Sequence, residues 1–250
     1  MTKPKVPHTL AVDIGGTGIK AATYAADGAR AIDSVRVATP YPCPPDCLLD
    51  EVAALASALP PAERAGVGFP GLLRSNRVVW VNSLTRSAAD GPTDDALVRQ
   101  WVGFDLRSGL EDRLGIPTRV ANDADVHALA TVGGVGLECV LTLGTGLGFS
   151  LVDDGRLLPH LELGGAPFLD SDFEGILGQA GLERAGQDAW HANVLAAIDA
   201  LRPFLYFDHL YVGGGNARLI DPASLGADVS VVSNVNGLRG GVLLWDEPRG

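Results

Sequence analysis

The chain has few of the features that mark secreted or metal-stapled proteins. Its 250 residues include three cysteines, an odd number. Cys43 and Cys47 are spaced four apart around two prolines, and neither has a set of cysteine or histidine partners nearby. Structural zinc sites need several such ligands at close spacing. We therefore expect free thiols and no zinc.

Long hydrophobic runs are missing as well. No apolar run reaches the roughly 20 residues that a membrane span requires, and residues 1–9 lack the apolar centre of a signal peptide. We therefore expect a cytoplasmic protein with no membrane partner.

Basic residues are scarce. The chain has 19 Lys and Arg against 30 Asp and Glu, which gives a net charge of −11. This balance argues against nucleic acid as a partner, but it permits a small phosphorylated ligand held by a few local groups. The hydrophobic content of 46% predicts a packed core, and the length suits one large domain or two modest ones.

Glycine, in contrast, is abundant, and it gathers first in the stretch LAVDIGGTGIKAATYAADG, residues 10–28. The spacing fits neither a P-loop nor a dinucleotide-binding loop, because no Gly-Lys pair is present and the third glycine position is Ala21. Two strands joined by a glycine-rich turn fit better, with a further turn at Asp27-Gly28. Backbone N–H groups in such a turn can bind an anion, although an ordinary tight hairpin remains an equal alternative.

An internal repeat favours the anion-binding alternative. Residues 139–155, CVLTLGTGLGFSLVDDG, repeat the order of strand, G-T-G, strand and D-G turn at about half the chain length. A repeat at this distance predicts two similar lobes rather than a solenoid. We expect the two glycine hairpins to hold a polyphosphate from both sides.

The remaining pattern predicts an α/β architecture with a mixed sheet in each lobe. In each half, a third strand is expected after the hairpin, over 29–40 and over 156–163. Helices are expected over 46–59, with Asp46 as the N-cap, over 95–101, over 105–115 ending at Gly115, and over 170–186 and 189–207. A strand passes into a helix over 118–134, and further strands at 209–213 and 228–234 precede a last, glycine-containing helix.

Two side chains near the first hairpin suit phosphate chemistry. Asp13 ends the first strand, where a carboxylate would repel phosphates unless a cation lies between them; Mg²⁺, reached directly or through water, is the natural mediator. Lys20 lies on the second strand and would reach phosphate oxygens. A solvated lysine on a strand face is an equal alternative.

Asn122, Asp123 and Asp125 lie where a strand becomes a helix, in VANDADVHALA. Asn122 would cap the helix, and the acids would suit its dipole, without any catalytic role. In the functional interpretation, Asp123 is a general base facing a substrate hydroxyl, as phosphoryl transfer requires.

Three later segments complete the candidate set. Glu162 in HLELGG and Glu174 in DFEGILG would accept hydrogen bonds from sugar hydroxyls, although each alone would pass for an exposed acid. The glycines and asparagine at 213–216 follow a strand, where small residues let a base or ribose approach the backbone.

In this order, the motifs resemble the ROK family of sugar kinases and repressors, and especially its short branch of polyphosphate/ATP glucokinases. DIGGTGIK and LTLGTGLG resemble its phosphate motifs, GFPG its G-x-P-G turn, VANDAD its catalytic segment, VGGGN its adenosine motif and NGLRGG the start of its C-terminal helix. The resemblance spans nearly the whole chain.

The resemblance implies an actin-like (ribonuclease H-like) ATPase fold of two lobes, 1–121 and 122–250, with the C-terminal helix packing back on the first lobe. It implies Mg²⁺, held at Asp13, and transfer of a terminal phosphoryl group to a hexose hydroxyl, with Asp123 as base. The sugar would contact Gly71, Asn122, Glu162 and Glu174. The phosphates and nucleotide would contact Asp13, Gly15, Gly16, Thr17, Lys20, Gly144, Thr145, Gly146, Gly214, Gly215 and Asn216. The family also dimerises often, so a homodimer is the assembly to test.

Two departures bear on the substrate. The family's cysteine-rich zinc motif is missing, as in the short branch. The usual E-x-G-H reads Glu162-Leu163-Gly164-Gly165, so a glycine replaces the histidine that would contact the sugar. On a strand, His160 would share a face with Glu162 and would substitute for the missing histidine.

Glucose is the favoured acceptor, and another hexose or an N-acetylhexosamine stays open. The donor stays open too: the short branch favours polyphosphate, and the acidic composition favours ATP. An inactive sugar- or nucleotide-binding regulator is the alternative function; the retained Asp123 and phosphate glycines argue against it.

Overall fold

The computed structural model describes residues 7–25, 29–30, 33–233 and 237–246. They form two compact units. The first contains the described residues up to His127 together with Gly237–Asp246, and the second contains residues 128–233.

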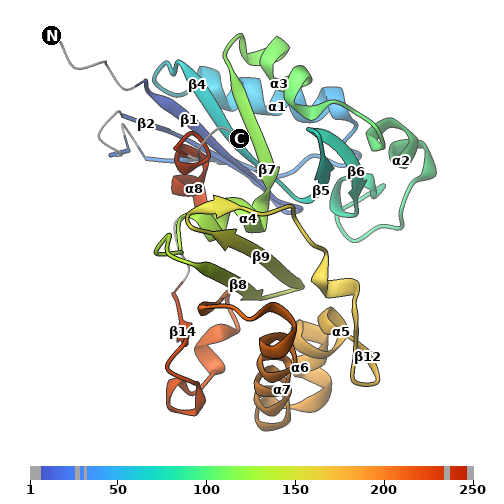
Figure 1. The fold of residues 1–250 in the computed structure, drawn as a ribbon. Helices are drawn as coiled ribbons and strands as arrows, with labels where there is room; N and C mark the ends of the chain where they lie inside the picture. Colours follow the sequence, from blue (N-terminus) through green and yellow to red (C-terminus); the bar gives the residue numbers. More distant parts are fainter. Residues whose placement is uncertain (1–6, 26–28, 31–32, 234–236, 247–250) are drawn as a thin grey trace, which may run out of the picture. The chain divides into compact units, whose positions relative to one another are not determined.

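A five-stranded mixed sheet forms the centre of the first unit, with strand order β3-β2-β1-β4-β7. β1 pairs antiparallel with β2 and parallel with β4, and β4 pairs parallel with β7. The carboxyl ends of β1, β4 and β7 therefore meet at one edge of the sheet (Figure 1). The strands are β1 Thr9–Ile14, β2 Ile19–Tyr24, β3 Val35–Val37, β4 Arg64–Phe69 and β7 Thr118–Asn122.

The second unit contains a sheet with the same arrangement, in the order β10-β9-β8-β13-β14. Here β8 pairs antiparallel with β9 and parallel with β13, and β13 pairs parallel with β14. The strands are β8 Leu137–Leu143, β9 Leu147–Asp153, β10 Arg156–Leu157, β13 His209–Gly213 and β14 Val229–Val231. The sequence repeat thus corresponds to two sheets of equal topology, and the predicted α/β class is confirmed.

Helices cover both faces of the first sheet. Along β1, Leu10, Val12 and Ile14 belong to the core that α1 and α3 share, whereas Ala11 lies in a cluster with Leu238 of α8. This alternation follows from the two-residue period of a strand. The helices of this unit are α1 Pro45–Ser57, α2 Asp95–Trp101, α3 Leu106–Leu114, the start of α4 Asp123–Leu129, and α8 Gly237–Leu243.

Glycines let α8 approach the sheet and α4 closely. A Cβ on Gly66 would lie 1.9 Å from the carbonyl oxygen of Gly241, and a Cβ on Gly240 would lie 1.7 Å from that of Val126. Any other residue would push the backbones apart, so these glycines permit a contact that joins the last helix to β4 and α4.

The second unit buries its core between the sheet and one long helix. Trp190, Val194 and Leu201 of α7 pack with Leu141 and Leu210 of the sheet. The helices are α5 Phe173–Leu177, α6 Gln179–Ala185 and α7 Gln187–Leu205. The predicted helix over 170–186 is therefore two helices, because the chain is extended at Gly178, between them.

Short elements complete the fold. Two small antiparallel ribbons are formed by β5 Gly71–Arg74 with β6 Arg77–Val81, and by β11 Pro167–Phe168 with β12 Ser171–Asp172. Turns of 3₁₀ helix are η1 Ser83–Thr85, η2 Leu163–Gly165, η3 Ala217–Leu219 and η4 Pro222–Ser224.

The cap predicted for α1 is wrong. The N-cap is Pro44, with no side-chain hydrogen bond, and Asp46 lies within the first turn. Pro45 explains the shift, because its fixed φ suits the first helical position and its missing N–H needs no partner. Asp46 still suits the helix dipole.

The third strand predicted for each half is also shorter than expected. In the first half, the strand found among the described residues of 29–40 is Val35–Val37. In the second half β10 ends at Leu157, and His160 and Glu162 lie beyond it. Pro159 cannot donate to a ladder, which ends the pairing. The turn predicted at Asp27-Gly28 lies outside the described residues.

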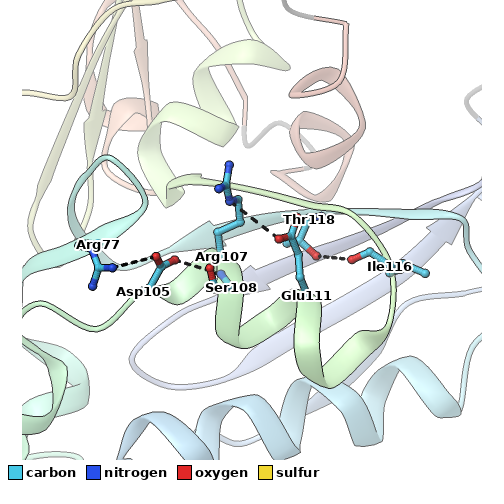
Figure 2. Close-up of polar contacts among 7 residues, drawn as sticks. All are labelled: Arg77, Asp105, Arg107, Ser108, Glu111, Ile116 and Thr118. Atoms are coloured by element: carbon cyan, nitrogen blue, oxygen red, sulfur yellow. Dashed lines mark hydrogen bonds and ion pairs between the residues drawn. The ribbon is translucent and has the colours of Figure 1, made fainter.

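A polar network joins α3 to β7 (Figure 2). Asp105 caps α3 by accepting from Ser108 N at 3.1 Å, and its other oxygen lies 3.3 Å from Arg77. The hydrogen bond from Ser108, with the charge of Arg77, lowers the pKa of Asp105. At the far end of the helix, Glu111 accepts from Thr118 N at 3.1 Å. Thr118 begins β7, the strand that leads to the candidate catalytic residues.

The three cysteines are free, and burial raises the pKa of Cys43 and of Cys139 to about 12. None of the described helices has both the length and the apolar character needed to cross a membrane.

Candidate active site

The first glycine hairpin joins β1 to β2 at the edge where β1 ends. Gly15 N donates to Gly18 O at 3.0 Å, which closes the turn. Thr39 donates to Gly15 O and Tyr41 to Gly16 O, both at 2.6 Å. These contacts hold the carbonyl groups of the turn.

The tip of this hairpin is open on its other side. Thr17 is exposed, and within the described part of the chain no hydrogen bond is found from Gly16 N or Thr17 N. A Cβ on Gly16 would lie 3.0 Å from Cβ of Ser83. The turn is therefore held firmly while two N–H groups remain for an anion.

Asp13, Lys20 and Gly68 form a row across three strands. Asp13 pairs with Lys20 on β2 and with Gly68 on β4, so the three lie on one face of the sheet. The Asp13 side chain is 19% exposed, and Lys20 is exposed. The missing side chain of Gly68 leaves room for α4: a Cβ there would lie 3.3 Å from Cα of Asp123.

Asn122 and Asp123 lie where β7 becomes α4. Asn122 donates from its amide to Gly71 O at 3.1 Å, and its oxygen accepts from Ala124 N at 2.8 Å. Asp123 Oδ1 also accepts from Ala124 N, at 2.9 Å. The capping role considered for Asn122 is therefore present in the structure. Capping by Asn122 is compatible with a catalytic role for Asp123, because the hydrogen bonds that hold Asn122 in place also restrict the backbone of the next residue, Asp123.

His127 joins this group, and the sequence analysis did not single it out. Its Nε2 lies 3.9 Å from Oδ1 of Asp13. The interaction with Asp13 raises the pKa of His127; burial opposes this rise, the charge of Asp123 adds to it, and that of Lys20 also opposes it. The spacing of four residues from Asp123 was the available signal, because it puts both side chains on one face of a helix.

The second hairpin, in the second unit, joins β8 to β9 through a turn that is one residue shorter than the first. Gly144 N donates to Gly146 O at 3.0 Å, and Thr145 is exposed at the tip. The backbone N–H of Leu147 donates to Glu174 Oε2 at 3.1 Å, and a Cβ on Gly146 would lie 2.6 Å from that oxygen. Glu174, predicted as a sugar ligand, is thus held against a predicted phosphate-binding turn.

The segment Gly214–Asn216 contacts the same hairpin. Asn216 donates from its side chain to Gly144 O at 3.3 Å and to Gln179 Oε1 at 3.0 Å. Gly214 has a φ of +88°, and a Cβ there would lie 2.2 Å from Leu143 O. This close contact requires glycine, so Gly214 and Asn216 have a structural role whether or not a nucleotide binds, whereas a Cβ on Gly215 would meet open space.

Glu162 and His160 lie in the irregular segment after β10. His160 Nε2 is 3.4 Å from Glu162 Oε1, and the His160 side chain is 7% exposed against 42% for Glu162. The two side chains interact, but not through a shared strand face as predicted. Gly165 has open space: no atom lies within 4 Å of a Cβ built there.

Within the described residues, no group of three or more His, Cys, Asp or Glu could hold a metal ion by itself. Mg²⁺ does not need such a cage, because it binds through one or two carboxylates together with substrate phosphates. Asp13, beside the open tip of the first hairpin, fits that kind of site.

The structure thus gathers the predicted site residues in two groups. The first unit holds Asp13, Gly15, Gly16, Thr17, Lys20, Gly71, Asn122 and Asp123. The second holds Gly144, Thr145, Gly146, Glu162, Glu174, Gly214, Gly215 and Asn216. The facing of the two hairpins across one polyphosphate stays a prediction.

Comparisons with known proteins place the chain among sugar kinases. The sequence profile of the ROK family matches residues 9–161, more than half of the chain. The polyphosphate glucokinase of Mycobacterium tuberculosis is 25% identical over 232 residues, which cover 86% of this chain and 80% of that protein. The N-acetylmannosamine kinase of Escherichia coli is 32% identical over 155 residues, which cover 60% of this chain and 49% of that protein.

The structural similarity extends further. The crystal structure of the inorganic polyphosphate/ATP-glucomannokinase from Arthrobacter sp. strain KM matches with a TM-score of 0.75 and 28% identity, over 96% of this chain and 99% of that one. Together with two sheets of equal strand order, this similarity confirms the predicted actin-like fold.

Proposed function

Because the chain belongs to the ROK family, we propose that it is a hexose kinase. It transfers the terminal phosphoryl group of ATP or polyphosphate to a hexose hydroxyl, with glucose as the favoured acceptor. The polyphosphate glucokinase and polyphosphate/ATP-glucomannokinase relatives support this class of donor and acceptor.

One arrangement carries the proposal. Asp13 and Asp123 lie at the carboxyl ends of β1 and β7, separated only by the end of β4, where Gly68 has no side chain. The same edge carries the first glycine hairpin. A phosphate-binding turn and a carboxylate base thus occupy neighbouring strand ends, where open α/β sheets bind ligands.

The chemistry follows from this placement. The sugar hydroxyl oxygen forms a bond to the terminal phosphorus, the bond from that phosphorus to the donor's bridging oxygen breaks, and Asp123 takes the hydroxyl proton. Asn122 holds the start of α4 in place, and the N–H groups of Gly16 and Thr17 bind phosphate oxygens. Mg²⁺, which Asp13 would hold, supplies neutralisation of phosphate charge.

The deciding experiment is a coupled assay that crosses glucose, mannose, fructose and N-acetylmannosamine with ATP and polyphosphate. We expect turnover with glucose, and we expect Asp123→Asn to lower kcat by about 10²–10⁴ because the base is lost. Asp95→Asn is the matched control, since Asp95 is an exposed acid in the first turn of α2. It should leave kcat unchanged.

Two results would contradict the proposal. The absence of phosphorylated product with every acceptor would favour the alternative of a binding protein without turnover. An Asp123→Asn rate equal to that of the wild type would remove Asp123 as the base.

A further inference from the structure

His127 has no part in the chemistry proposed above, yet it lies among the residues that carry it. Its Nε2 atom is buried and lies 3.9 Å from Asp13 Oδ1, although the side chain as a whole is 39% exposed. This distance is that of an ion pair rather than a hydrogen bond. Catalytic hydrogen bonds are often long before the substrates bind.

Glycines on two elements, β4 and α8, put the imidazole there. Gly68 lets the first turn of α4 approach β4, since a Cβ there would lie 3.3 Å from Cα of Asp123, which is tighter than an ordinary contact. Gly237, at the start of α8, is in direct contact with the ring, since a Cβ there would lie 2.0 Å from His127 Nε2. The ring is thus enclosed by α8 on one side and directed at β1 on the other.

The charges around the ring come from three elements. Asp13 on β1, Asp123 on α4 and Lys20 on β2 are the charged side chains whose fields act on the ring. Of the two carboxylates, that of Asp13 is the one with an oxygen 3.9 Å from the imidazole Nε2. A neutral side chain of similar shape would fill the space but would leave Asp13 without this donor.

We propose that His127 is a positioning residue for Asp13. Its Nε2–H donates to one carboxylate oxygen of Asp13 and leaves the other directed at the cation–phosphate complex. Such hydrogen bonds to a ligating carboxylate orient it, and their loss typically costs about 10–100-fold in metal affinity. The inference rests on the proposed function, since it assumes that Asp13 meets a metal–phosphate complex.

The test measures binding rather than turnover. The probe is the preformed Mn²⁺–tripolyphosphate complex, followed by the EPR signal of Mn²⁺ on the full chain. We expect His127→Leu, which fills space without a donor, to weaken binding by about 10–100-fold. His127→Gln keeps an N–H at similar reach and should stay within about threefold of the wild type.

A double-mutant cycle separates positioning from a structural role. If His127 acts through Asp13, His127→Leu should weaken binding much less in an Asp13→Asn background than in the wild type. His191→Gln is the control, because the His191 ring contacts Ser224 and belongs to the second unit. This variant should leave the affinity for the Mn²⁺ complex unchanged. The proposal would be overturned if His127→Leu and His127→Gln lost the same affinity for the Mn²⁺ complex. It would also be overturned if His127→Leu had the same effect in the wild type and in the Asp13→Asn background.

The outcome is distinguishable from failure of the proposed function. A wild-type protein that binds the Mn²⁺ complex but phosphorylates no hexose would refute the kinase and leave the role of His127 intact. A wild-type kinase whose His127→Leu variant binds the complex normally would refute only the role of His127. In the active enzyme, the hexose KM should stay unchanged in His127→Leu while the Mg²⁺ requirement rises.

Discussion

At the residue scale, Glu138 is a buried acid whose carboxylate binds several donors at once. It is 2% exposed on β8. Its carboxylate accepts from the backbone N–H groups of Gly133, Gly134 and Val135 at 2.6 to 3.1 Å, and from the Tyr211 hydroxyl at 2.9 Å. It thus organises the loop that leads into the second sheet.

We expect Glu138→Ala to lower the free energy of unfolding by about 3 kcal/mol, because several donors lose their acceptor in a buried place. Tyr211→Phe removes one donor and leaves the carboxylate bound, so it should cost about 1 kcal/mol. Urea unfolding of the two variants checks the order. Equal costs would contradict the central role of the carboxylate.

His160 and Gly165 belong to this scale as well. We predict that His160→Ala raises the hexose KM about 5- to 30-fold, since Glu162 loses its neighbour at 3.4 Å. Gly165→His, at a position with open space, should lower the KM for glucose by adding a donor. Steady-state kinetics with glucose test both, and an unchanged KM in His160→Ala would remove His160 from the sugar site.

At the scale of elements, the starts of α1 and α3 show when a cap is a real contact. Asp46 has the sequence signature of a cap but makes no capping bond, because Pro44 and Pro45 already define the helix start. Asp105 makes the bond, and the network of Figure 2 surrounds it. An acid near the start of a helix therefore does not by itself predict a capping hydrogen bond, because neighbouring prolines can define the helix start instead.

We expect Asp105→Ala to lower the free energy of unfolding by about 1 kcal/mol at pH 7, and Asp46→Ala to change it little. Since folding lowers the pKa of Asp105, its contribution is present above the unfolded pKa of about 3.9. The contribution is lost as the pH falls through the lower, folded value. The difference between wild type and Asp105→Ala should thus shrink in urea titrations below about pH 4. A difference that grows in acid would contradict this sign.

At the scale of the whole molecule, residues 237–246 belong to the first unit although they follow the second unit in sequence. α8 packs on β1 and β4 through glycines, and Trp245 after it donates to Ala65 O at 3.0 Å and lies under the guanidinium of Arg119 at 4.8 Å. The last described residues therefore complete the face of the sheet that carries Asp13.

Gly240→Ala should lower the free energy of unfolding by about 3 kcal/mol or more, because its Cβ would lie 1.7 Å from a backbone oxygen of α4. Arg239→Ala, at the exposed neighbouring position, is the control and should cost little. Thermal unfolding together with limited proteolysis near residue 240 would detect a displaced α8. Normal stability of Gly240→Ala would mean that α8 does not need this contact.

The sequence by itself determined the two-sheet architecture. The order of strand, glycine turn and strand recurs in each half with a two-residue apolar period, and few other folds fit that pattern. The sequence also predicted the end of α3 at Gly115, where a φ of +69° favours glycine. The expected continuation of β10 to residue 163 overlooked Pro159, which cannot donate to a strand ladder.

Only the tertiary structure decided that the His127 imidazole lies beside the Asp13 carboxylate. The two residues are far apart in sequence, and the contact depends on how closely α4 approaches β4 at Gly68 and α8 approaches the His127 ring at Gly237. Close approach is a property of packed backbones, and no local pattern of residues specifies it.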